Sequence, residues 1–101
     1  MSLINFNGEI EDLDNKENKI LYFNSPFCGQ CFGLKTKLEN ISLKYPSIKL
    51  YSINVKDRNN IGEKYKIQIL PYLLFIKNGI ITDNITGNIS EEILEKKFKE
   101  F

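Results

Sequence analysis

A dense apolar run, a short break and a long run with helical spacing follow one another directly, and this succession constrains the fold most. Residues 19–24 predict a β-strand, residues 25–27 interrupt it, and the apolar spacing over residues 29–45 predicts a helix. The chain's only two cysteines, Cys28 and Cys31, lie where that helix begins. A strand that leads into a helix in this way is typical of α/β folds.

The position of Cys28 at a helix start favours a reactive thiolate. Unpaired backbone N–H groups and the positive end of the helix dipole stabilise an anion there. A free thiol has a pKa of about 8.5, and lowering it to roughly 7 makes about half of the thiol nucleophilic at neutral pH. Cys31 lies one helical turn later and is expected to be more buried. The pair predicts dithiol chemistry, with Cys28 as the nucleophile and Cys31 as the resolving thiol.

Length and composition are typical of one small globular domain, which we expect to span residues 1–101. The chain is 42% hydrophobic and has a formal net charge of +1, so charge gives no reason to expect nucleic acid or membrane as a partner. The N-terminal residues lack the pattern of a signal peptide, and no segment reaches bilayer-spanning length. We therefore expect a cytoplasmic protein. In that reducing compartment a close cysteine pair is more often catalytic or metal-binding than structural.

The rest of the chain predicts further alternation of strands and helices. Asn78-Gly79 between two apolar runs predicts a tight hairpin, and Ser90 ahead of two glutamates predicts a helix cap. The expected order is β-α-β-α-β-α-β-β-α. It predicts an α/β fold with a central mixed sheet of four to five strands and helices on both faces. The further strands are expected at Leu3–Phe6, Ile48–Val55, Tyr72–Ile76 and Ile80–Thr86, and the further helices at Ile10–Lys16, Ile61–Tyr65 and after Ser90.

Three segments in this order resemble the thioredoxin family, and the resemblance covers almost the whole chain. Residues 24–31, Asn-Ser-Pro-Phe-Cys-Gly-Gln-Cys, are similar to that family's aromatic-Cys-Gly-x-Cys active site. Residues 65–71 resemble the segment that leads to its cis-proline, and residues 75–79 resemble its hairpin. The resemblance implies the thioredoxin fold and a cis Leu70–Pro71 bond that faces the cysteines. It also implies that the backbone of Leu70 is presented to an extended substrate segment.

The resemblance also implies a thiol–disulfide oxidoreductase, and foremost a protein-disulfide reductase that works by mixed-disulfide exchange. No metal or other cofactor is expected, because the electrons reside in the two sulfurs. The expected partners are protein disulfides and an electron donor of the thioredoxin reductase type, and the chain is expected to be a monomer that serves electron transport and cell redox homeostasis. Beside the two catalytic cysteines, the expected active-site and substrate-binding residues are Phe27, Gly29, Gln30, Leu70, Pro71 and Gly87.

Several positions depart from the family's pattern. The buried aspartate that many thioredoxins place six residues before the first cysteine corresponds to Tyr22, so proton transfer at Cys31 must use water, the substrate or another group. We interpret Tyr22 as a core aromatic, because a phenol with a pKa near 10 is poorly matched to acid–base work at neutral pH. Asn24 and Phe27 stand where the family often has tryptophan. Gln30 replaces a common proline, which leaves the redox potential open.

Three other functions stay open. Glutaredoxins typically carry Thr-Val before the cis-proline and a Gly-Gly-acidic patch for glutathione, whereas this chain has Ile69-Leu70 and no Gly-Gly pair after Pro71. The missing buried acid favours a specialised redox adaptor with little turnover. A metal-binding dimer is disfavoured, since zinc and iron–sulfur sites normally need four Cys or His ligands and the chain has two Cys and no His.

Overall fold

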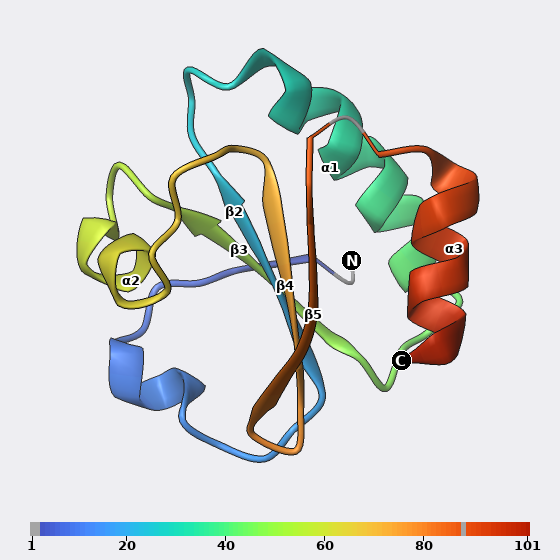
Figure 1. Ribbon diagram of the computed structural model, residues 1–101, viewed down its shortest axis with the longest axis horizontal. Coiled ribbons are helices and arrows are strands. Elements are labelled where there is room, and N and C mark those ends of the chain that lie inside the picture. The colour runs from blue at the N-terminus through green and yellow to red at the C-terminus, as the bar shows by residue number, and fades with distance from the viewer. Residues whose placement is uncertain (1–2, 88) are drawn as a thin grey trace.

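The computed structural model describes residues 3–87 and 89–101, and these residues build a mixed sheet of five strands (Figure 1). β2 pairs in parallel with β3, which pairs in parallel with β1, while β4 is antiparallel to β2 and to β5. The sequence predicted four to five strands, and the sheet has five. In spatial order the strands are β1 (Leu3–Asn5), β3 (Lys49–Asn54), β2 (Lys19–Asn24), β4 (Tyr72–Lys77) and β5 (Ile80–Thr86).

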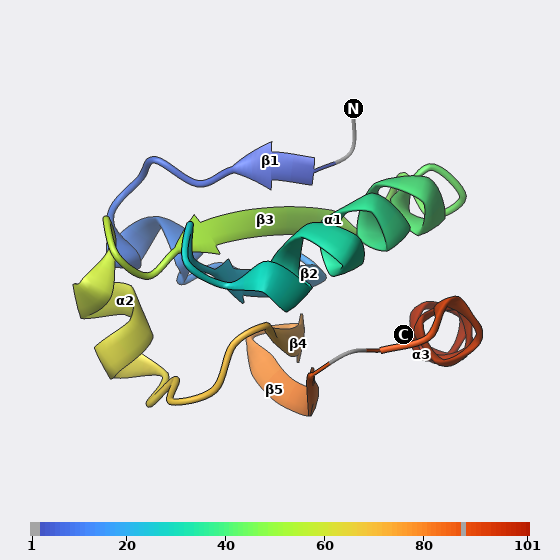
Figure 2. The same cartoon turned by 90° about the horizontal axis from the view of Figure 1, so that it is seen from above.

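Helices cover both faces of this sheet. Helices α1 (Gly29–Ser42) and α3 (Glu91–Glu100) lie on one face, and α2 (Asn59–Lys64) and the 3-10 turn η1 (Ile10–Leu13) lie on the other (Figures 1 and 2). This arrangement confirms the predicted mixed sheet with helices on both faces. Among the described residues, none of the helices has the length and apolar character needed to span a bilayer.

The two central strands supply both halves of the core. Successive side chains of a strand point to opposite faces, so Leu50 and Ile53 of β3 fall on different sides of the sheet. Leu50 packs with Tyr22 in the cluster beneath α1 and α3. Ile53 packs with Phe23 and Ile61 in the cluster beneath α2. This strand is therefore covered on both sides, in agreement with the predicted sheet that carries helices on both faces.

Two local signals are also confirmed by the backbone geometry. Asn78 and Gly79 both have positive φ angles, 54° and 80°, as the tight hairpin between β4 and β5 requires. At the start of α3 the side chain of Ser90 accepts a hydrogen bond from the Ile93 N–H at 3.2 Å.

Helix α1 ends earlier than its apolar spacing predicts. The prediction extended to Tyr45, but the helix ends at Ser42. The following turn is closed by the shorter i to i+3 pattern, with the Tyr45 N–H donating to the Ser42 carbonyl at 3.1 Å. Pro46 explains the change, because a proline disfavours the helical conformation in the residue before it.

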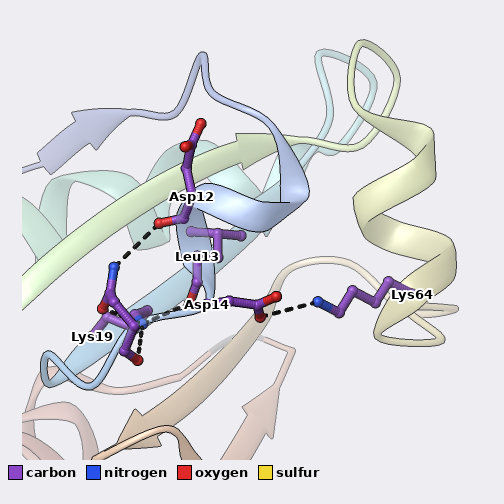
Figure 3. A network of polar contacts seen from close by, with 6 residues as sticks. Asp12, Leu13, Asp14, Lys19 and Lys64 are labelled. Atoms are coloured by element: carbon purple, nitrogen blue, oxygen red, sulfur yellow. Dashed lines mark hydrogen bonds and ion pairs between the residues drawn. The ribbon is translucent and has the colours of Figure 1, made fainter.

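The acidic segment after β1 is also less helical than predicted. Only Ile10–Leu13 forms a 3-10 turn, and the chain then runs as a loop into Lys19. The Lys19 side chain is 0% exposed, and its Nζ donates to the carbonyls of Leu13 (2.8 Å) and Asn15 (3.1 Å) and to Asn15 Oδ1 (2.8 Å). Figure 3 shows Lys19 reaching into this loop. Burial lowers the pKa of Lys19, and the nearby carboxylates of Glu17 and Asp14 oppose that shift.

We expect Lys19→Met to lower the free energy of unfolding by about 1–3 kcal/mol, because the buried Leu13 carbonyl loses its donor. Urea unfolding of the oxidised protein, followed by circular dichroism, measures the change. The matched control is Lys64→Met, which removes an exposed ion pair with Asp14 (3.4 Å, Figure 3) and should cost less than about 0.5 kcal/mol. Equal losses in the two variants would contradict the role given to Lys19.

Candidate active site

The turn between β2 and α1 places the first cysteine at the head of the helix. The Phe27 N–H donates to Ser25 Oγ at 3.2 Å, and the Cys28 N–H donates to the Ser25 carbonyl at 3.1 Å. These bonds turn the chain sharply after Asn24, so that Cys28 caps α1 with an extended backbone. The N–H groups of Gly29 and Gln30, in the first helical turn, therefore follow directly on Cys28.

Cys28 and Cys31 form a disulfide, with their Cα atoms 5.3 Å apart. The two sulfurs have different surroundings, since Cys28 is only partly buried and Cys31 is 4% exposed. After reduction, the helix N-terminus stabilises a thiolate at Cys28, and this thiolate is the one that a partner can reach. The arrangement supports thiol–disulfide exchange that begins at Cys28 and closes at Cys31.

A hollow of about 540 Å³ adjoins the exposed side of the disulfide. It brings four of the predicted site residues together with Cys28, and it adds Ser25 and Gln68, which the sequence analysis did not single out. Gln68 carried no sequence signal beyond its place shortly before Pro71. The full lining consists of Ser25, Phe27, Cys28, Gly29, Gln30, Gln68 and Leu70.

The Leu70–Pro71 peptide bond is cis, in the conformation that the resemblance implied. Leu70 packs against both core clusters, and Pro71 is buried. Neither Pro71 nor Gly87 lines the hollow. The Gly87 N–H instead donates to the Pro71 carbonyl at 3.2 Å, with a φ angle of 88° that favours glycine. Gly87 therefore supports the loop that carries Leu70.

Phe27 is the most exposed large apolar side chain beside the hollow. It is 81% exposed, and Lys56 Nζ lies 4.5 Å from the centre of its ring. That cation–π contact was not predicted, because the two residues lie far apart in sequence. Ile69, next to Leu70, is exposed as well. The rim of the hollow thus offers apolar surface to a partner.

Tyr22 is a core residue, as predicted, and it also contacts the site. Its side chain is 2% exposed, and its hydroxyl donates to the Cys31 carbonyl at 2.5 Å. Burial raises the pKa of Tyr22 to about 12. The phenol therefore stays protonated at neutral pH, and its hydrogen bond ties the start of α1 to the central strand.

A second and larger cavity, of about 610 Å³, adjoins Cys31 and opens to solvent beside Phe32. Cys31 and Tyr22 form part of its wall together with two polar side chains, Asn24 and Ser52. Asn24 Nδ2 donates to the Tyr22 carbonyl at 3.1 Å and to Ser52 Oγ at 2.9 Å. This pairing has no signal in the sequence, because its members belong to different strands.

No cluster of three or more His, Cys, Asp or Glu side chains that could hold a metal occurs within residues 3–87 and 89–101. The chemistry that these residues do provide resides in the two sulfur atoms.

Comparison with known proteins agrees with this geometry. The family model Thioredoxin matches residues 1–100. A thioredoxin from Chlorobaculum thiosulfatiphilum is 30% identical over 95 residues, which are 93% of this chain and 88% of that protein. A Thioredoxin H-type from Fagopyrum esculentum is 25% identical over 77 residues, which are 76% of this chain and 66% of that protein. The match to a chloroplastic Thioredoxin M-type from Pisum sativum, at 30% identity, spans 46% of that protein.

The solved structures add the fold. The crystal structure of oxidised thioredoxin O2 from Arabidopsis thaliana has a TM-score of 0.86 to this chain at 21% identity, covering 98% of this chain and 93% of that one. Oxidised mitochondrial thioredoxin 3 from Saccharomyces cerevisiae also has a TM-score of 0.86, at 19% identity, with coverage of 99% and 96%. A family match of that extent, on a chain whose two cysteines are joined at the head of α1, shows that this protein belongs to the thioredoxin family.

Proposed function

We propose that this protein is a thiol–disulfide oxidoreductase that reduces disulfides in other proteins. One observation carries the proposal. The disulfide presents its more exposed end, Cys28, at a helix N-terminus and in the same hollow as Leu70 of the cis-proline loop. A nucleophile that is stabilised as an anion and open to solvent on one side fits an attack on a disulfide of a large partner.

The reaction proceeds in two exchanges. The Cys28 thiolate attacks one sulfur of the substrate disulfide, and the other substrate sulfur leaves as a thiolate that takes up a proton. Cys31 then loses its proton and attacks the Cys28 sulfur, which expels the second substrate thiolate. Two electrons pass from the dithiol to the substrate, and the Cys28–Cys31 disulfide remains.

The hollow beside Cys28 is the surface on which we place the substrate. Leu70 offers backbone groups to an extended segment, and Phe27 offers an exposed ring. Gly29 and Gln30 form the neighbouring wall. Pro71 has no N–H of its own, so within this pair the backbone donor is that of Leu70.

The electron donor in this proposal is an enzyme of the thioredoxin reductase type, and the protein acts as a cytoplasmic monomer in electron transport and redox homeostasis. The sulfurs store the electrons, so no resident cofactor is required. A specialised adaptor with little turnover is the second candidate. It is favoured by Tyr22, which offers no acid–base group beside Cys31 at neutral pH.

Cys31→Ser should trap substrates as mixed disulfides on Cys28, because the second exchange can no longer occur. The variant is incubated with a cell lysate, and the adducts released by dithiothreitol are identified by mass spectrometry. The double variant Cys28→Ser, Cys31→Ser is the matched control and should capture nothing. If Cys28 of the single variant still reacts with iodoacetamide but captures no protein, the reductase assignment fails.

Insulin reduction should couple to NADPH through a thioredoxin reductase rather than through glutathione and glutathione reductase. The physical reason is that the hollow carries an apolar rim suited to a protein surface. NADPH consumption in the two coupled assays measures the preference. Coupling through glutathione alone would point to a glutaredoxin-like protein. If neither electron donor supports insulin reduction, the adaptor is favoured.

Phe27→Ala should lower kcat/KM for insulin by about threefold to tenfold, because a partner loses an apolar contact beside Cys28. Phe32→Ala is the matched control. Phe32 is also exposed, at 66%, but it lines the larger cavity and not the hollow. Both variants should react with a small aryl disulfide at the unsubstituted rate. An equal loss of insulin reduction in the two variants would contradict the placement of the substrate.

A further inference from the structure

The cavity beside Cys31 takes no part in the docking of the substrate at Cys28. It lies on the face of the sheet that α1 and α3 cover, since its wall includes Tyr22 and Cys31 from that core cluster. Polar side chains from the ends of β2 and β3, among them Asn24 and Ser52, form much of the wall. Its volume of about 610 Å³ is large enough for several water molecules.

The second exchange requires that a proton be removed from Cys31. Cys31 is 4% exposed, and its thiol must lose a proton before its sulfur can attack Cys28. In the proposed docking the substrate lies in the hollow beside Cys28, which Cys31 does not line. A proton acceptor is therefore required next to Cys31, and the cavity is the space that adjoins it.

Among the described residues, no titratable or charged side chain that lines this cavity forms a hydrogen bond to the Cys31 sulfur. The Tyr22 hydroxyl donates to the Cys31 carbonyl, and burial raises the pKa of Tyr22 to about 12. Lys35 and Asp57 are exposed, and the Arg58 guanidinium is bound to a backbone carbonyl at 2.8 Å. The chain has no histidine.

We propose that water in this cavity, held by Asn24 and Ser52, takes the proton of Cys31 during the second exchange. The inference rests on the proposed function and extends it to the proton. The S–H bond of Cys31 breaks, its proton passes to cavity water and on to solvent, and its sulfur bonds to Cys28 as the substrate thiolate leaves.

The hydrogen bonds of the polar pair support this role. Both hydrogens of the Asn24 amide are used, since Nδ2 donates to the Tyr22 carbonyl (3.1 Å) and to Ser52 Oγ (2.9 Å). Within residues 3–87 and 89–101, Asn24 Oδ1 accepts no hydrogen bond and the Ser52 hydroxyl donates none. One acceptor and one donor thus remain for water, beside Cys31. Asn24 and Ser52 are positioning residues, because they act on the water and not on the sulfur.

The test follows the two exchanges separately in a stopped-flow reaction of the reduced protein with Ellman's reagent. Cys28 releases a first aryl thiolate in a phase that depends on reagent concentration. Cys31 then releases a second aryl thiolate in a phase whose rate is independent of reagent concentration. In the unsubstituted protein the second phase should rise about tenfold per pH unit between about pH 6 and 8, because a thiol without a neighbouring base ionises with a pKa of about 8.5 or above.

Ser52→Val and Asn24→Leu should slow the second phase by about threefold to tenfold and leave the first unchanged, since each removes a hydrogen bond to the water. Ser52→Thr is the conservative control. It keeps the hydroxyl group and should keep the rate of the second phase. Tyr22→Phe should keep the pH slope. A merely structural role of the pair would not separate the two phases, and circular dichroism checks that each variant is folded.

Each outcome bears on the proposal. A slowed second phase, restored by threonine, supports it. An unchanged second phase in both Ser52→Val and Asn24→Leu overturns it, and so does a rate that levels off near neutral pH in the unsubstituted protein or a pH slope lost in Tyr22→Phe. If the unsubstituted protein shows neither phase, the proposed function itself fails, and this inference fails with it.

Discussion

Four residues separate the end of β2 from the start of α1, and the helix lies back along the sheet because one of its faces is apolar. Cys31, Leu34, Leu38 and Ile41 are buried in the cluster that β2 and β3 also form. Burying one leucine stabilises a fold by about 1.5–3 kcal/mol, so this face holds the helix more firmly than the bonds of the preceding turn. This packing explains why Cys31 is more buried than Cys28. Cys31 belongs to the buried face, and Cys28 precedes it.

The features that could be predicted from the sequence are those that neighbouring residues determine. Asn78-Gly79 specifies its hairpin through two residues that accept positive φ, and Ser90 caps α3 through its own hydroxyl. The paired cysteines could be placed at a helix start because a strand, a proline-containing break and a helical run stand side by side in the chain. Leu50 and Ile53 could be assigned to opposite faces because strand periodicity is local.

What could not be predicted depends on residues that meet only in the fold. Lys19 looks like a polar strand end in the sequence, yet its long side chain is buried under a loop whose carbonyls it binds. Asn24 and Ser52 meet because β2 and β3 pair in parallel with a particular register. The Gly87 N–H donates to the Pro71 carbonyl, sixteen positions earlier in the chain. No periodicity or spacing contains these contacts.

The two cysteines of the disulfide face different environments. One environment suits the docking of a partner protein, and the other suits the transfer of a proton. On the side of Cys28 the hollow has an apolar rim, so a partner can dock there and exclude water from the reacting sulfurs. On the side of Cys31 the cavity wall includes amide and hydroxyl groups. In our proposal, water on that second side takes part in proton transfer without weakening the docking of the partner. Tyr22 lies in the cavity wall, and its hydrogen bond to the Cys31 carbonyl holds the start of α1 against the sheet, between the two environments.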